Sequence, residues 1–174
     1  MKIETITETR LNVSQDAEIA ELLACCFPTD FGGRSFYQQR HHVRLVARDP
    51  GLVGHMALTL RAIRTGGQLT DIAGLAEVAT HPAHRGKGIA ATLLQAAIAE
   101  ARDSSAAFLL LFGTARLYAA AGFLPVHNPM TWIDLTGAHT GVVHSQRAES
   151  LMVLPLRDKH WNAAAPLDML GGLF

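Results

Sequence analysis

One stretch, residues 77–90 (EVATHPAHRGKGIA), constrains the fold more than any other part of the chain. The residues from Leu75 to Thr80 are apolar or β-tolerant, and Pro82 cannot continue a central strand because it lacks an N–H. Two glycines and two cations then fall within Arg85–Gly88. From Ile89 onward the apolar residues recur on one helical face. The stretch therefore predicts a strand, a glycine-rich loop and a helix, in that order.

Such a loop is suited to hold an anion. The first amides of a helix lack intrahelical partners, and the helix dipole adds partial positive charge beside them. Arg85 and Lys87 add formal charge, so a phosphate or pyrophosphate is the natural ligand. A P-loop is excluded because Gly88, and not Ser or Thr, follows Lys87. The dinucleotide fingerprint is excluded because Ala91 stands where its third glycine belongs. The alternative for the two glycines is a tight turn without a ligand.

Two motifs in the right order resemble the GNAT superfamily of acyl-CoA-dependent N-acetyltransferases. Residues 85–90 (RGKGIA) match Q/R-x-x-G-x-G/A, and residues 117–123 (LYAAAGF) match the aromatic Y-x-x-x-G-F turn. The resemblance implies that acetyl-CoA (coenzyme A) is the co-substrate, that no metal is needed, and that the loop amides hold the pyrophosphate. The cofactor-binding residues implied are Val78, Ala79, Thr80, Arg85, Gly86, Lys87, Gly88, Ile89 and Ala90, with an N–H near Val78 meeting the acyl oxygen.

Acyl transfer to an amine also needs an acid for the leaving thiolate and a base for the amine. Tyr118 stands where the family's tyrosine stands, and a phenol can protonate a thiolate of similar basicity. Its alternative role is a core aromatic. Glu77 borders the expected cleft and could remove a proton through a water or bind an ammonium group. Its alternative role is a solvated carboxylate at the strand edge. The aminoglycoside enzymes place their acid one position earlier, at Ala76.

The acceptor pocket is predicted from a wider resemblance to aminoglycoside 2'-N-acetyltransferases and rhizobial nodulation N-acyltransferases. It is carried by residues 26–31 (CFPTDF), 117–125, 152–156 (MVLPL) and the tail 161–174. It implies that Asp30, Phe31 and the tail bind the acceptor. The tail has few acids, whereas a polycationic sugar needs several carboxylates, so we expect a small-molecule amine of another kind. The alternative for the tail is a hydrophobic strap over the sheet.

Two other functions fit the same motifs. A GNAT-fold protein could bind CoA without transferring the acyl group, and the lack of an Asn in Leu111–Gly113, before Tyr118, favours that alternative. A longer-chain N-acyltransferase, like the nodulation enzymes, would differ in the size of its pocket. We expect direct transfer of an acetyl group to a primary amine.

The composition limits which classes of partner and which cellular compartment we expect. Among 174 residues, 49% are hydrophobic and 17% are charged, with fifteen cations and fifteen anions. This balance gives no field that attracts nucleic acid or an anionic membrane. Cys25 and Cys26 are adjacent and lack metal-ligand spacing, and the N-terminus has no signal-peptide pattern. We expect a cytoplasmic enzyme, with a homodimer left open. The histidines have no spacing for a triad or a metal and are interpreted as surface or loop residues.

The order of elements predicts an α/β (α+β) fold in a single domain over residues 1–174. The resemblance implies a GNAT fold: a mixed, mostly antiparallel sheet of about 6–7 strands, flanked by helices and splayed at the strand pair that holds CoA. The expected strands cover 2–8, 43–48, 52–64, 69–80, 107–112, 130–135 and 151–156; the expected helices run from Ser14 or Asp16 to about Phe27, over 35–39, from 89 to about 102, and from a Thr114 cap to Gly122, and 139–146 is expected to be a loop.

Overall fold

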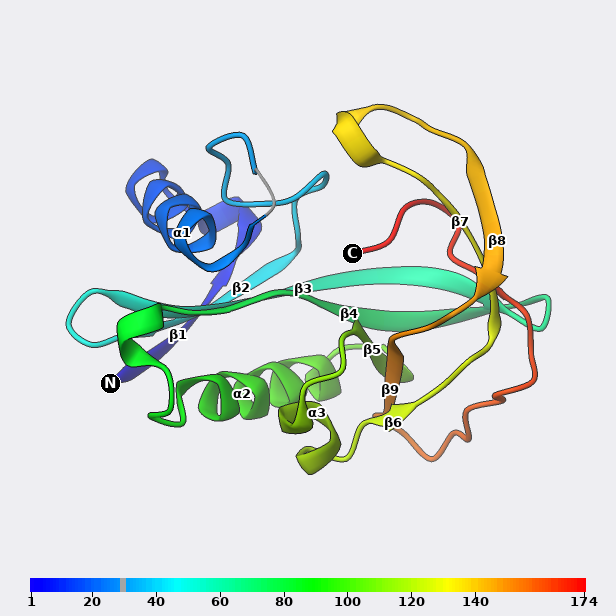
Figure 1. Ribbon diagram of the computed structural model, residues 1–174. Helices are drawn as coiled ribbons and strands as arrows, with labels where there is room; N and C mark the ends of the chain where they lie inside the picture. The colour runs from blue at the N-terminus through cyan, green and yellow to red at the C-terminus, as the bar shows by residue number, and fades with distance from the viewer. Residues whose placement is uncertain (29–30) are drawn as a thin grey trace. The chain divides into compact units, whose positions relative to one another are not determined.

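The computed structural model describes residues 1–28 and 31–174 (Figure 1). It forms two compact units, each built from two segments of the chain. Unit 1 comprises Met1–Thr59 and Leu75–Glu100, and unit 2 comprises Leu60–Gly74 and Ala101–Phe174. The two longest strands, β3 and β4, contribute one part to each unit. The single domain expected over residues 1–174 stays a prediction.

The strands and α-helices follow the order predicted from the sequence, except that no helix forms at residues 35–39 and that short strands are added on the C-terminal side. They are β1 (Lys2–Thr7), η1 (Glu8–Arg10), α1 (Val13–Cys26), β2 (Val43–Arg48), β3 (Leu52–Thr65), β4 (Gln68–Thr80), η2 (Pro82–His84), α2 (Ile89–Asp103), β5 (Phe108–Phe112), α3 (Arg116–Ala120), β6 (Leu124–Pro125), β7 (Pro129–Ile133), η3 (Thr136–Ala138), β8 (Val143–Arg147), β9 (Leu151–Pro155) and β10 (Leu167–Asp168).

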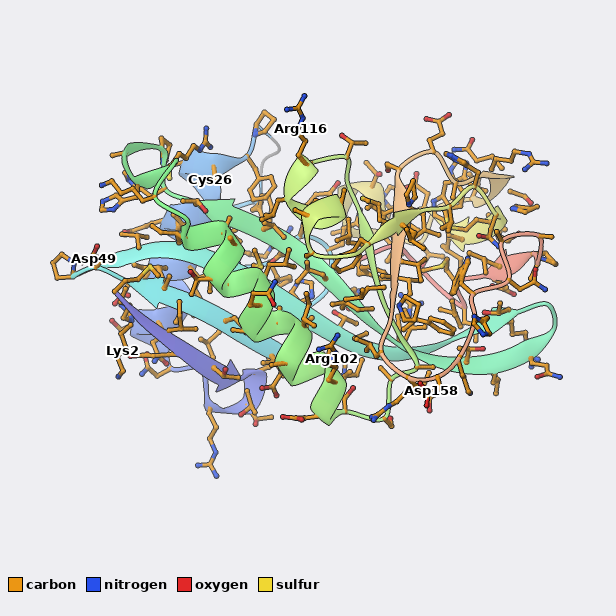
Figure 2. The ribbon with its side chains drawn as sticks, turned by 90° about the horizontal axis from the view of Figure 1, so that it is seen from below. Lys2, Cys26, Asp49, Arg102, Arg116 and Asp158 are labelled. Atoms are coloured by element: carbon orange, nitrogen blue, oxygen red, sulfur yellow. The ribbon has the colours of Figure 1, made fainter. Side chains whose placement is uncertain are left out.

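Unit 1 is a sheet between two helices (Figure 1). β1 pairs antiparallel with β2, and β2 pairs antiparallel with β3, with Val43 opposite Leu58. The apolar face of α1 packs on Val46 of the sheet. On the other face, α2 runs across the strands (Figure 2). A Cβ at Gly54 would lie 2.7 Å from Ile89 and 2.8 Å from Leu93, so only glycine permits this close approach of helix to strand.

Unit 2 contains the strand order β6-β9-β5-β4-β3-β10-β7-β8. β5 and β6 each pair antiparallel with β9, β7 pairs antiparallel with β8, and β10 pairs parallel with β7. Its core is a cluster of buried apolar side chains around Ile63, Ile72 and Leu110. The tail contributes Leu173 and Phe174, which pack on this cluster.

The mixed sheet flanked by helices confirms the predicted fold class, but several local predictions are wrong. Over residues 1–28 and 31–174 the sheet has ten strands and not six or seven, because β8 forms where residues 139–146 were expected to be a loop and because β6 and β10 are additional two-residue strands. Residues 35–39 form bends and no helix. α1 is capped by Asn12, whose side chain accepts the Gln15 N–H at 2.9 Å, and not by Ser14 or Asp16.

Candidate active site

The end of β4 carries the first of the predicted cofactor residues. Ala79 is buried, while Val78 and Thr80 are half-buried. The His81 N–H donates to the Val53 carbonyl at 2.9 Å, so the chain stays tied to β3 just past the end of β4. The His81 side chain then caps η2, because its Nδ1 accepts the Ala83 N–H at 3.2 Å.

The loop from Arg85 to Gly88 is exposed and leads directly into α2. Gly86 and Gly88 have φ angles of 77° and 78°, in the left-handed region that a side chain would strain. The Thr92 N–H donates to the Gly88 carbonyl at 3.0 Å, so the helical hydrogen bonding of α2 begins at Gly88. The amides that precede this bond belong to the first turn, where helices bind anions. This geometry is the one expected from the sequence.

Glu77 departs from regular strand geometry and is held by several partners. Its φ of 52° is uncommon for a residue other than glycine. Its side chain is only 6% exposed, and Oε2 lies 3.0 Å from Arg44 Nη1. Oε1 accepts the Tyr37 N–H at 2.6 Å. Burial acts to raise the pKa of Glu77, but the contacts with His41, His55 and Tyr37 outweigh it and hold the pKa below its ordinary value. The carboxylate is therefore ionised and engaged at neutral pH.

Arg44 is fully buried at the centre of this cluster. Its Nε donates to Glu8 Oε2 at 2.8 Å, and its Nη1 donates to the Ser35 carbonyl at 2.8 Å. A buried guanidinium is tolerated only where carboxylates and carbonyls surround it. Arg44 therefore ties β2 to η1, to the segment before β2, and to Glu77 of β4.

His55 fixes the backbone of Glu77. Its Nε2 lies 3.4 Å from Arg44 Nη1, and since a guanidinium can only donate, Nε2 accepts. The proton is then on Nδ1, which donates to the Glu77 carbonyl at 3.0 Å. Burial, and next the charge of Arg44, lower the pKa of His55 to about 4, so the ring is neutral at pH 7. This bond helps to hold Glu77 in its left-handed conformation.

His41 approaches Glu77 from the other side. Its Nε2 lies 3.0 Å from Glu77 Oε1, although this contact lacks the alignment of a hydrogen bond. Its Nδ1 lies 2.7 Å from Thr59 Oγ1. His55 is buried within β3, so its interpretation as a surface or loop residue is wrong; His41 lies in the irregular segment before β2, as a loop residue would, but is buried. The signal available in the sequence was a set of polar residues, Arg44, His55 and Glu77, within three otherwise apolar strands.

Of the two residues predicted to bind the acceptor, the structure describes Phe31 but not Asp30. Asp30 lies outside the described residues. Phe31 is buried in the core of unit 1, where its ring centroid lies 5.5 Å from those of Phe27 and Tyr37. Its neighbour Tyr37 is the residue whose amide Glu77 holds. The roles of Asp30 and Phe31 in binding an acceptor stay predictions.

Tyr118 lies in α3 of unit 2 and is buried. Its ring centroid lies 6.1 Å from that of Phe123, and a Cβ at Gly113 would lie 3.0 Å from the ring. Burial raises the pKa of Tyr118, so the phenol keeps its proton at neutral pH. The packing agrees with the core role that the sequence left open. It is equally compatible with a proton donor, whose hydroxyl must be protonated before it acts.

The C-terminal tail packs along unit 2. The Arg61 guanidinium donates to the carbonyls of Met169 and Gly172, and Phe174 lies 5.4 Å from Phe112 between ring centroids. A Cβ at Gly74 would lie 2.6 Å from the Phe174 ring. This arrangement is the hydrophobic strap that the sequence offered as the alternative for the tail.

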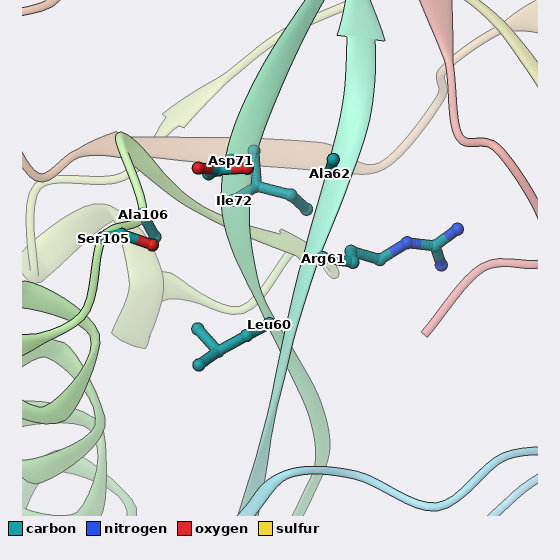
Figure 3. A pocket seen from close by; sticks show the side chains of 7 residues that line it. All are labelled: Leu60, Arg61, Ala62, Asp71, Ile72, Ser105 and Ala106. Carbon is teal, nitrogen blue, oxygen red and sulfur yellow. The ribbon is translucent and has the colours of Figure 1, made fainter.

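A separate hollow of about 240 Å³ opens in unit 2 (Figure 3). It is lined by Leu60, Arg61, Ala62, Asp71, Ile72, Ser105 and Ala106. The Arg61 side chain points away from Asp71 and Ser105 in this view, toward the tail that it holds. The hollow is smaller than the roughly 300–1,000 Å³ of most ligand sites. None of the residues predicted to be functional lines it.

Two further observations concern metals and membranes. Among residues 1–28 and 31–174, no three His, Cys, Asp or Glu side chains gather in a way that could hold a metal ion. Within the same described part of the chain, no helix combines the length and the apolar character needed to cross a membrane.

Residues 11–126, more than half of the chain, match the family of acetyltransferase (GNAT) domains. The chain belongs to this family. The match contains both motifs singled out in the sequence and confirms the predicted superfamily. The finer resemblance to aminoglycoside and nodulation enzymes stays a prediction. No curated protein sequence matches the chain.

Solved structures of GNAT proteins share the fold. The GNAT family N-acetyltransferase YhbS from Escherichia coli, in complex with CoA, has a TM-score of 0.66 and 20% identity, covering 96% of this chain and 88% of its own. A GNAT family acetyltransferase from Brucella melitensis, in complex with acetyl-CoA, has a TM-score of 0.59 and 18% identity, covering 94% of both chains. The ribosomal-protein-S18-alanine N-acetyltransferase from Escherichia coli has a TM-score of 0.60 and 15% identity, covering 92% and 98%. At these identities the likeness establishes the fold.

Proposed function

We propose that this GNAT protein transfers an acetyl group from acetyl-CoA directly to the primary amine of a small molecule. The observation that carries the proposal is the loop from Arg85 to Gly88. Its two left-handed glycines turn the chain into the N-terminus of α2, with Arg85 and Lys87 exposed beside the amides. A diphosphate is the anion that best matches several amides, a helix dipole and two cations. The CoA and acetyl-CoA complexes of two structural neighbours support the same cofactor.

The contacts of the rest of acetyl-CoA are proposed with its pyrophosphate at this loop. In the proposal Val78, Ala79 and Thr80 pair with the pantetheine arm, and an amide near Val78 polarises the acyl carbonyl. The first turn of α2, with Ile89 and Ala90, completes the pyrophosphate site. A preorganised amide is effective because it acts where negative charge develops in the transition state.

The proton transfers are assigned to two side chains. Tyr118 protonates the departing CoA thiolate, because burial keeps its phenol protonated at neutral pH. Glu77 removes a proton from the amine or binds its ammonium form, since its carboxylate is ionised and lies near the end of β4. Asp30 and Phe31 remain the proposed contacts of the acceptor. The cytoplasm as compartment, a small-molecule partner and the absence of nucleic-acid or membrane partners remain part of the proposal.

The test begins with calorimetric titration of acetyl-CoA into three proteins: the wild type, the double variant Gly86→Asp/Gly88→Asp, and Gly67→Asp. Gly67 is a matched control because its φ is also left-handed, at 86°, and a Cβ there would also meet no atom within 4 Å. We expect binding by the wild type and the control, and its loss in the double variant. A wild type that does not bind acetyl-CoA would overturn the proposal.

Turnover is then measured by mass spectrometry on a panel of primary amines, with acetyl-CoA and with a long-chain acyl-CoA. An acetylated amine supports the proposed reaction. Binding without transfer to any amine would point to a CoA-binding protein without transferase activity. Preference for the long-chain donor would reassign the protein as a longer-chain N-acyltransferase.

A further inference from the structure

Thr59, His41 and Glu77 form a chain of hydroxyl, imidazole and carboxylate within unit 1. Thr59 Oγ1 lies 2.7 Å from His41 Nδ1, and His41 Nε2 lies 3.0 Å from Glu77 Oε1. The order of groups is that of a nucleophile or proton carrier, a base and an orienting acid. None of the three lies near the others in sequence, so the chain exists only because the sheet assembles it.

The sheet register explains the meeting of these residues. β2 pairs with β3 from Val43 opposite Leu58, and the His42 N–H donates to the Leu58 carbonyl at 2.9 Å. The residues just before β2 therefore run beside Thr59. Glu77 then reaches His41 from β4, where its left-handed conformation and its bond from His55 fix its direction.

Burial gives the chain an inner and an outer end. The side chains of His41 and Glu77 are 4% and 6% exposed, whereas Thr59 is only half-buried. The charged neighbours of His41 are the Glu77 carboxylate and, in direct contact with that carboxylate, the Arg44 guanidinium; neutral His55 contacts Arg44 and the Glu77 carbonyl. Despite burial, the contacts with His41, His55 and the Tyr37 amide hold the pKa of Glu77 below its ordinary value, so a proton that arrives on His41 meets a carboxylate that is ionised at neutral pH.

We propose that Thr59 is the catalytic contact of the amine and that His41 and Glu77 are positioning residues behind it, which together form the route by which the amine loses its proton. This inference rests on the proposed function. The attacking nitrogen gives a proton to Thr59 Oγ1 as the Thr59 hydroxyl proton passes to His41 Nδ1. The nitrogen forms the new bond to the acyl carbon, the carbon–sulfur bond breaks, and the thiolate takes its proton from Tyr118. His41 then releases its proton to solvent and Tyr118 takes one up from solvent, so both groups return to their starting state.

Glu77 then has the role of supporting His41, and not of taking the proton from the amine itself. The Glu77 carboxylate already accepts hydrogen bonds from the Tyr37 amide and from Arg44, and the His41 ring lies against it as a third partner. Such a group is better suited to hold an imidazolium than to reach a substrate. The base that the sequence assigned to Glu77 alone thus becomes a pair, with the proton residing on His41.

The experiment compares Thr59→Val, Thr59→Ser and His41→Gln with the wild type, using acetyl-CoA and the best acceptor found in the amine panel. We expect Thr59→Val and His41→Gln to lose kcat by a factor on the order of 10², as for other general bases, with acetyl-CoA binding unchanged. Thr59→Ser should restore kcat to within a few-fold, because it keeps the hydroxyl. The rate of Thr59→Val should rise more steeply with pH than that of the wild type, since only amine already deprotonated by solvent can react.

Thr65→Val is the matched control, because Thr65 lies on the same strand and its buried hydroxyl has no hydrogen-bond partner. It should turn over like the wild type. If Thr59→Val lowers Tm strongly, Thr59→Ala is measured in its place. Full kcat in a folded Thr59 variant that lacks the hydroxyl would overturn the proton route and leave the proposed function intact. A wild type that binds acetyl-CoA but acetylates no amine would overturn both.

Discussion

Arg44 Nη1 lies 3.0 Å from Glu77 Oε2, and this ion pair is almost completely removed from water. The two residues come from strands β2 and β4, and Glu8 holds the other side of the guanidinium. A lone charge in this position would be costly, so each member requires the other. The pair therefore couples the stability of unit 1 to the geometry of the strand that precedes the glycine-rich loop.

Replacing Arg44 with Met should destabilise the protein strongly. The substitution leaves the Glu77 carboxylate buried without its guanidinium, and breaking a buried pair in this way typically costs about 3–5 kcal/mol. Urea denaturation of the variant and the wild type measures the change in the free energy of unfolding.

Arg48→Met is the control for this prediction. Arg48 pairs with Glu18 at 2.5 Å, but its side chain is 22% and that of Glu18 39% exposed. Loss of this more exposed pair should cost about 1 kcal/mol or less. Equal effects of the two substitutions would contradict the special role of the buried pair.

His55 should make the protein less stable as the pH falls from about 6.5 toward 4. The pKa of His55 is lowered to about 4 in the folded state, so the unfolded chain binds a proton in this window that the folded chain does not. Stability then rises with pH, with a slope of up to about 1.4 kcal/mol per pH unit, and the slope vanishes below the folded pKa.

The measurement is urea denaturation at several pH values between 4 and 7. A His55→Gln variant should show a shallower slope in this range, because it has no proton to take up on unfolding. His139 is exposed, so His139→Gln should keep the slope of the wild type. An unchanged slope in His55→Gln would show that other groups cause the pH dependence.

Much of the fold could be predicted because it rests on local signals. Alternation and turn residues located β2, β3 and β4, and the RGKGIA motif located both the loop and the start of α2. Residues 143–147 were missed as a strand because VHSQR alternates weakly and four of its five residues are exposed, so only the pairing with β7 defines β8. The sequence of residues 143–147 alone therefore does not indicate a strand.

The candidate site also has one part that the sequence could predict and one part that it could not. The glycine-rich loop could be located because its residues are consecutive. The cluster around Glu77 could not, since Arg44 and His55 come from β2 and β3 and His41 comes from the segment just before β2, and they meet Glu77 of β4 only through the sheet register. The left-handed conformation of Glu77 was equally hidden, because nothing local requires φ above zero at a glutamate.

Asn12→Ala should destabilise α1 by about 1 kcal/mol. The Asn12 side chain accepts the Gln15 N–H at 2.9 Å, and the Gln15 side chain accepts the Asn12 N–H at 3.1 Å, so the substitution breaks a reciprocal cap. Ser14→Ala tests the cap expected from the sequence, and since Ser14 is exposed inside the helix it should change stability little. Thermal or urea unfolding distinguishes the two, and a larger loss in Ser14→Ala would refute the assignment of the cap.

Gly74→Ala should be destabilising because of one aromatic ring. The new Cβ would lie 2.6 Å from the Phe174 ring, which already packs on Phe112, so the ring must move or the strand must shift. Overpacking of this kind typically costs about 1–3 kcal/mol. In the double variant Gly74→Ala/Phe174→Ala the clash is gone, so the penalty of the methyl group should be much smaller than in the wild-type background. A double-mutant cycle by urea denaturation measures this coupling. Additive effects would mean that Phe174 does not occupy this position in solution, and the tail would then not act as a strap over Gly74.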